Sequence, residues 1–224
     1  MKTNKQNCHF SFDTINNFDD HINKSVSNYH SLVDLIQKIS TYFITENSNV
    51  YDLGCSTGLL LKQLHKQNKN NASFVGYDIS DNLLKETSSK NLSFYLRDIT
   101  DDSIKFYNTN FILLIFTLQF LQITQREKLL KKVCKNLNKG GACIVAEKIY
   151  IDDGFVEDIF TFTHYDQKLN NFSHEEILKK QIDLRSIMRP LTEEQNIDMF
   201  YDAGFSKIQS FYQSLNFKSW LLIK

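Results

Sequence analysis

The segment from Val50 to Gly58 constrains the fold of this chain more than any other. It begins as an apolar, β-branched run, which favours a buried strand, and then enters a turn that contains Gly54 and Gly58. Leucines at helical spacing follow from Leu59 onward. Because glycine lets the backbone approach a ligand closely, we expect a strand, a ligand-contacting turn and a helix. The spacing is neither the three-glycine dinucleotide pattern nor a phosphate-binding loop, and a plain turn in another doubly wound sheet is the alternative.

Acidic residues follow the next two predicted strands. Asp78 ends the apolar run that starts at Phe74, just over twenty residues past Gly54, and Asp98 follows the strand that ends at Leu96. A carboxylate at the end of a second strand can accept hydrogen bonds from both hydroxyls of a ribose. Asp78 could instead cap a helix that starts near Ser80. Acids in order after successive strands therefore indicate a nucleoside site, with the capping role as the alternative.

Strand and helix signals alternate along most of the chain. Strands are predicted at 48–53, 73–78, 92–96, 110–116 and 141–147, with helices between them, the clearest over 124–137. Such alternation is typical of a parallel sheet with right-handed crossovers. Two more strand-like runs, 208–212 and 217–222, are close enough in sequence to form an antiparallel pair. We therefore expect one α/β domain, 1–224, that begins with an arm and helix at 1–45.

One long segment, 149–191, interrupts the alternation. It is rich in aromatic residues and ends in a charged helix, whose start is predicted by the capping box of Ser173 and Glu176. Insertions of this length in a compact fold usually carry a function. We expect a helical cover over the active site or a dimer surface, and an ornamental helical hairpin is the alternative.

Composition excludes several classes of function. Lysine plus arginine equals aspartate plus glutamate at 26 each, so no overall field attracts nucleic acid or anionic lipid. The four cysteines are scattered and predict no metal site. The longest apolar run, 111–121, is too short to span a membrane, and the polar start at 2–7 lacks the apolar core of a signal peptide. We therefore expect a cytoplasmic protein with a small-molecule substrate.

The D-x-G-x-x-x-G pattern that starts at Asp52 resembles motif I of the class I S-adenosylmethionine (SAM) methyltransferases. More specific runs resemble the carboxy-SAM synthase family: F-T-L-Q-F-L from Phe116, A-E-K around Glu147, and H-x-D-x-K from His164. The resemblance covers nearly the whole chain. It implies a Rossmann-like, seven-stranded, mostly parallel sheet with helices on both faces, and homodimers that pair through the insertion. Members of this family bind SAM and prephenate and make carboxy-SAM, which a partner enzyme uses to modify the wobble uridine of tRNA.

The resemblance also implies a set of residues that line the SAM pocket. They are Tyr29, Asp52, Gly54, Cys55, Ser56, Gly58, Asp78, Ile79, Asp98, Ile99 and Phe116. Two positions depart from the family pattern: Ile115 stands where the family has asparagine, and Gln181 where it has the arginine that holds the extra carboxylate of carboxy-SAM. Glutamine can donate a hydrogen bond but cannot offset a carboxylate's charge. Lys180, Arg185 or Arg189 could compensate from a neighbouring turn.

These observations predict a SAM-dependent methyltransferase that acts on a small molecule. Such an enzyme needs mainly to align the acceptor and exclude water, because the methyl sulfonium is already electrophilic. The candidate catalytic residues are Glu147, His164, Tyr165 and Arg185, although Glu147 could simply pair with Lys148 and His164 could be a surface histidine. The alternative functions are carboxy-SAM synthase proper, with carboxy-SAM as the bound nucleoside, and a SAM-fold binding module without chemistry.

Overall fold

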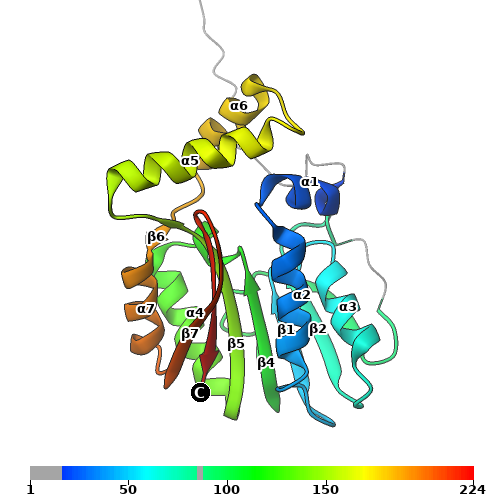
Figure 1. The fold of residues 1–224 in the computed structure, drawn as a ribbon. Coiled ribbons are helices and arrows are strands. Elements are labelled where there is room, and N and C mark those ends of the chain that lie inside the picture. The colour runs from blue at the N-terminus through cyan, green and yellow to red at the C-terminus, as the bar shows by residue number, and fades with distance from the viewer. Residues whose placement is uncertain (1–16, 85–87) are drawn as a thin grey trace, which may run out of the picture.

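The computed structural model describes residues 17–84 and 88–224, so the predicted arm lies outside it up to residue 16. One twisted sheet forms the centre of the molecule, with helices on both faces (Figure 1). Its strands are β1 (Asn49–Leu53), β2 (Ser73–Asp78), β3 (Leu92–Leu96), β4 (Thr109–Ile115), β5 (Leu137–Tyr150), β6 (Leu191–Thr192), β7 (Lys207–Ser214) and β8 (Phe217–Ile223). The order is β3-β2-β1-β4-β5-β8-β7, and the short β6 pairs only with β5.

The first five strands are parallel, and β8 runs antiparallel to both β5 and β7. The predicted seven-stranded, mostly parallel sheet is therefore confirmed, with the two-residue β6 added beside the last two residues of β5. The predicted antiparallel closing pair is confirmed as β7 and β8.

The helices are α1 (Phe18–Ser25), α2 (Tyr29–Ser40), α3 (Leu59–Gln67), α4 (Ile123–Asn136), α5 (Gly154–Lys168), α6 (His174–Arg185) and α7 (Glu193–Asp202). A 3₁₀ turn, η2 (Leu118–Phe120), follows β4. Among the described residues, no helix is long and apolar enough to cross a membrane.

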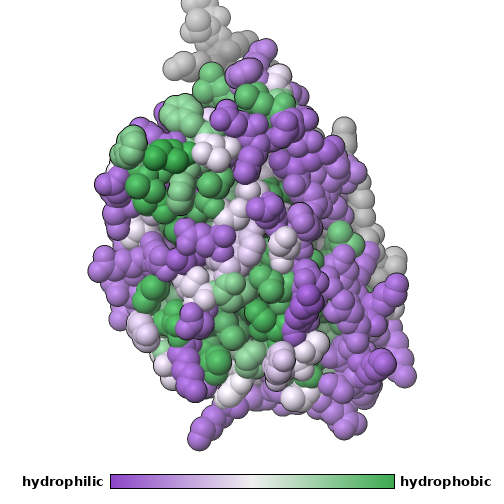
Figure 2. Space-filling model, viewed as in Figure 1, coloured by the Kyte–Doolittle hydropathy of each residue, from purple (hydrophilic) through white to green (hydrophobic). Residues whose placement is uncertain are grey.

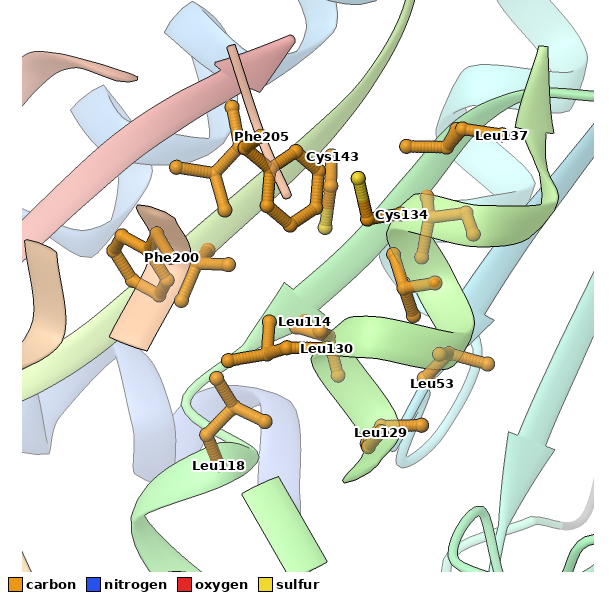
Figure 3. Close-up of a cluster of buried hydrophobic side chains, with 14 of the residues drawn as sticks. Leu53, Leu114, Leu118, Leu129, Leu130, Cys134, Leu137, Cys143, Phe200 and Phe205 are labelled. Carbon is orange, nitrogen blue, oxygen red and sulfur yellow. The ribbon is translucent and has the colours of Figure 1, made fainter. Parts of the chain in front are cut away.

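Two apolar cores lie on opposite faces of the sheet. Successive residues of a strand point to opposite faces, so Phe111 of β4 packs with α2 and α3, while Ile112 packs with α4 and α7. Figure 3 shows part of the second core. Leu130 of α4, Phe200 of α7 and Leu114 of β4 belong to one buried cluster there. These residues are fully buried, so the sheet is a rigid platform for whatever its ends carry.

The order of elements differs from the prediction in three places. The strand predicted from residue 141 begins at Leu137, directly after α4, because a left-handed Gly140 (φ 78°) and a register shift against β4 let the strand continue through the polar stretch. The described residues near Ser80 form a turn, not the start of a helix. No helix occurs over 97–108, because Ile104 and Phe106 of that loop cover the sheet themselves.

The insertion stands beyond the end of the sheet at which β5 finishes (Figure 1). It consists of α5 and α6, joined by a short turn in which Ser173 and Glu176 form the predicted capping box. The side chain of Ser173 accepts a hydrogen bond from the Glu176 amide at 3.2 Å, and the Glu176 carboxylate accepts from the Ser173 amide at 2.7 Å. The predicted helical insertion after the fifth strand is thus confirmed, and it lies on the side where ligands bind in open parallel sheets.

Candidate active site

A cavity of about 750 Å³ lies between the carboxyl ends of the strands, α1 and the insertion. This volume suits a ligand of the size of a nucleoside with an attached amino acid. The predicted site residues that line it are Tyr29, Asp52, Gly54, Cys55, Ser56, Asp78, Ile79, Asp98, Ile99, Phe116 and His164. Four predicted residues, Gly58, Glu147, Tyr165 and Arg185, are not among its lining.

The turn after β1 has the tight shape that its glycines predict. Gly54 has a φ of 89°, and the Gly54 and Cys55 amides both donate to the Tyr77 carbonyl, at 2.8 and 3.0 Å. A Cβ atom on Gly54 would lie 2.5 Å from Thr117 Oγ1, so the turn after β4 packs directly on its backbone. Gly58 has a φ of 74°, and a Cβ there would collide with the Phe94 ring. Gly58 therefore shapes the turn from behind and does not face the cavity.

Asp78 organises the acidic side of the cavity. One carboxylate oxygen accepts a hydrogen bond from the Ser56 amide at 2.7 Å and the other from the Ser80 amide at 2.9 Å. Each oxygen has a second lone pair and can still accept from a ligand hydroxyl. Asp52 is 3% exposed, and its pKa is raised to about 7 by burial and by the charge of Asp78. Carboxylates gathered on one side of the cavity suit a cationic ligand, which would offset their repulsion.

Lysines gather at the opposite side of the cavity. Lys148 of β5, Lys168 of α5 and Lys180 of α6 all line it. Lys168 is 7% exposed, and its pKa is lowered to about 8 by burial and by the charge of Lys148. The pKa of Lys180 is also lowered to about 8, by burial and by Lys168. Within the described part of the chain, no ion pair joins Lys148 or Lys168 to a carboxylate. Clustered buried ammonium groups of this kind suit an anionic ligand.

His164 lies among these lysines. It is 6% exposed, and its ring packs against Phe217 with 5.1 Å between centroids. Burial and the charges of Lys168 and Lys148 lower the pKa of His164 to about 3, so the imidazole is neutral at physiological pH. Its Nδ1 atom is buried and has no hydrogen-bond partner in the described residues. A buried polar atom without a partner is rare in proteins, and a ligand in the cavity would supply one.

The other predicted catalytic residues lie elsewhere. Glu147 is 2% exposed and accepts a hydrogen bond from the Leu118 amide at 3.0 Å, on the side of β5 opposite to Lys148. Tyr165 lines a separate groove between α5 and α6, because one residue along a helix turns the side chain by about 100°. Arg185 is exposed at the end of α6. The geometry therefore brings only His164 of these four to the cavity.

Two lining residues that sequence reasoning missed had a detectable signal. Lys168 stands four residues after His164, so the two side chains must share one face of their helix. Lys148 follows Glu147 on a strand, so their side chains must point to opposite faces of the sheet. Asp19 and Thr57 also line the cavity and are hydrogen-bonded to each other at 2.7 Å. No local pattern marked this second pair, because they are 38 residues apart in the chain.

Comparison with known proteins agrees with this geometry. Residues 44–204 match the family described as a methyltransferase domain. The carboxy-SAM synthase of Staphylococcus epidermidis is 37% identical over 216 residues, which cover 94% of each chain. This chain belongs to the class I SAM-dependent methyltransferase family, in the branch of the carboxy-SAM synthases. A second member of that branch, from Colwellia psychrerythraea, is 31% identical over 96% of this chain and 92% of its own.

Solved structures show the same methyltransferase fold. Human N-acetylserotonin methyltransferase in complex with SAM superimposes with a TM-score of 0.55 and 16% identity over 79% of this chain, which spans about half (47%) of the human chain. The YcgJ protein of Bacillus subtilis superimposes with a TM-score of 0.58 and 14% identity, over 82% of this chain and 71% of its own. At these identities the likeness concerns the fold. As a member of this methyltransferase family, the chain is a SAM-dependent transferase, with SAM as its cofactor or substrate.

Proposed function

We propose that this methyltransferase transfers the methyl group of SAM to a small anionic acceptor. The observation that carries the proposal is the polarity of the cavity, which has Asp52 and Asp78 at one side and Lys148 and Lys168 at the other. SAM carries a cationic ammonium group and a sulfonium, which match the acidic side. SAM has only one carboxylate, so the cluster of lysines offers positive charge to a second, anionic molecule.

The geometry suggests a role for each group. Asp78 would accept hydrogen bonds from the ribose hydroxyls, and the turn at Gly54 would pack on the methionine half of SAM. Lys148 and Lys168 would hold the acceptor's anionic group and so align its nucleophile with the methyl carbon. His164, neutral and without a partner at Nδ1, is the group that could form a hydrogen bond with the acceptor.

Carboxy-SAM synthesis is the second candidate. It is favoured by the names of the relatives and by the same lysines, which could bind prephenate or offset the carboxylate of carboxy-SAM. Gln181 lines the cavity with Lys180, so the position at which the resemblance implies an arginine lies on the cavity wall. Of the residues proposed to replace that arginine, Lys180 lines the cavity, whereas Arg185 and Arg189 are not among its lining.

The nucleoside retained through purification distinguishes the two candidates. Mass spectrometry of the bound fraction should give SAM or its demethylated product if the chain is a methyltransferase. A mass one carboxylate heavier than SAM would contradict methyl transfer and support carboxy-SAM synthesis. Incubation with SAM and prephenate, followed by the same measurement, extends the test to protein that has lost its ligand.

Lys168→Met tests the anionic side of the cavity. We expect the affinity for carboxy-SAM or prephenate to fall by about 1.5–3 kcal/mol, the value of a charged hydrogen bond, while the affinity for SAM changes little. Because the pKa of Lys168 is about 8 without ligand, wild-type affinity for these anions should be highest below pH 8 and fall as the pH rises through 8. Calorimetry at pH 7 and pH 9 measures both effects. Lys179→Met, on the exposed side of α6, is the matched control. Equal losses in both variants would contradict an anion site at Lys168.

A homodimer is proposed from the surface of the insertion. Apolar side chains gather over α5 (Figure 2), and Phe155, Ile159 and Phe162 are 76%, 45% and 62% exposed. Exposed apolar surface of this kind marks protein interfaces, and a second copy agrees with the pairing that the family resemblance implies. Light scattering should report a dimer for the wild type and a monomer for Phe162→Asp. A wild type that is monomeric at micromolar concentration would contradict the pairing.

A further inference from the structure

Helix α1 forms one wall of the cavity but is itself weakly held. Seven residues from Phe18 to Val26 line the cavity, yet none of the residues of α1 is buried. A helix of only 8 residues is not stable by itself, so its position depends on contacts at its ends. Such an element opens at a lower free energy than the sheet to which it is attached.

The contacts of α1 join the two sides of the cavity. Asp19 accepts a hydrogen bond from the Thr57 hydroxyl at 2.7 Å, and Thr57 belongs to the turn between Gly54 and Gly58. His21 packs edge-on against Phe172 of the insertion, with 5.6 Å between ring centroids. α1 therefore bridges the turn expected to hold SAM and the insertion that covers the acceptor side, as its place in Figure 1 shows.

The other end of α1 is fixed to the sheet. The Tyr212 hydroxyl of β7 donates to the Ser27 and Asn28 carbonyls, at 3.0 and 3.1 Å, and Asn28 adopts a left-handed conformation with a φ of 55°. The link between α1 and α2 is thus anchored at the point where the chain reverses direction. Rotation about this link would lift α1 from the cavity without disturbing α2, whose buried face packs on the core.

We infer that α1 is a lid that closes over SAM and is latched by the hydrogen bond between Asp19 and Thr57. Charge explains why the ligand would favour closure. Asp19 and Asp52 both act on the phenol of Tyr29, which places the two carboxylates on the same side of the cavity. Closure brings the Asp19 carboxylate to the cavity that Asp52 and Asp78 also line, and a cationic ligand there would attract it. The inference depends on SAM binding and not on the identity of the acceptor.

The rate of SAM dissociation tests the latch. Asp19→Ala removes the acceptor of the Thr57 hydroxyl, so SAM should dissociate on the order of tenfold faster, the effect of losing about 1.4 kcal/mol. Asp20→Ala is the matched control, because Asp20 is the next residue but pairs with Lys24 on the exposed side of α1. Stopped-flow displacement of SAM measures both rates. Equal dissociation rates in the wild type and both variants would overturn the proposal.

Two further measurements separate a latch from a general loss of structure. Thr57→Val should also increase the dissociation rate, and the double variant should be no faster than Asp19→Ala alone, because that single variant has already lost the hydrogen bond that Thr57→Val removes. Additive effects would contradict a shared latch. Hydrogen exchange of residues 18–25 should slow when SAM is added to the wild type and change less in Asp19→Ala. Exchange in α1 that does not respond to SAM would contradict ligand-coupled closure.

Discussion

At the scale of single residues, we expect SAM binding to depend on Asp78. Its two carboxylate oxygens already orient the turns at Ser56 and Ser80, so the same side chain shapes the pocket and offers acceptors to the ligand. Both roles that the sequence left open, ligand contact and capping of the following turn, are therefore compatible with one geometry. The remaining lone pairs are the ones that a ribose would use.

Asp78→Ala should weaken SAM binding by about 1–3 kcal/mol, because the ribose hydroxyls would lose their acceptor. Calorimetry with SAM gives the affinity, and circular dichroism checks that the fold is retained. Asp81→Ala serves as the control, since Asp81 is exposed on the following turn. Unchanged affinity in a folded Asp78→Ala protein would contradict its assignment to the cofactor site.

Gln181→Arg should shift the preference of the site toward carboxy-SAM. A charged, bidentate contact to a carboxylate contributes roughly 1.5–3 kcal/mol, against about 1 kcal/mol for a neutral hydrogen bond. Gln181 lines the cavity, so the arginine would reach the same space. Competition binding of SAM and carboxy-SAM to both proteins measures the shift. A wild type that already binds carboxy-SAM far more tightly would mean that the lysines have taken over the role of the arginine.

At the scale of elements, the turn after β4 is held in place by the buried side chains of Glu147 and Arg126. Phe116 has a φ of 55°, a strained value for a bulky residue, and it faces the cavity. Glu147 accepts from the Leu118 amide, and the Arg126 guanidinium donates to the Gln119, Leu121 and Arg189 carbonyls, at 3.2, 3.0 and 2.6 Å. These contacts connect β4, β5 and the end of the insertion. They hold the turn in which Phe116 keeps its strained backbone conformation beside the cavity.

Glu147→Ala should lower the free energy of unfolding by about 1–3 kcal/mol, because it leaves the buried Leu118 amide without its acceptor. Glu147→Gln should cost much less. Burial raises the pKa of Glu147 to about 8 against the opposing effect of Arg126, so glutamine resembles its neutral form. Chemical denaturation gives both values. Equal costs for the two variants would contradict this account.

The raised pKa of Glu147 also makes the free energy of unfolding depend on pH. Because folding raises the pKa of Glu147 from 4.5 to about 8, its contribution to stability is present below pH 4.5 and is lost as the pH rises through 8. Glu147→Gln should lack this loss. Chemical denaturation at pH 6 and pH 9 gives the free energy of unfolding of both proteins. This free energy should differ less between the two pH values in the variant than in the wild type.

At the scale of the whole molecule, the sheet order brings the site together. β1 and β4 are neighbours, so the turn at Gly54 meets the turn at Thr117, although 63 positions separate them. The insertion and α1 then close the cavity from above. Neither segment belongs to the central sheet, yet they supply Lys168, Lys180 and Asp19.

The sequence by itself determined the central α/β sheet and the half of the cavity that is lined by Gly54, Asp78 and Asp98. Turn chemistry at Gly54 and the acids after successive strands are local signals, and parallel strands must end on one edge, so these residues had to converge. Only the tertiary structure decided the other half. The direction of a side chain on β5 or α5 depends on register and helix rotation, which placed Lys148 and His164 at the cavity and turned Glu147 and Tyr165 away from it. The pairing of Asp19 with Thr57 depends on how a terminal helix packs, and no local interaction specifies that.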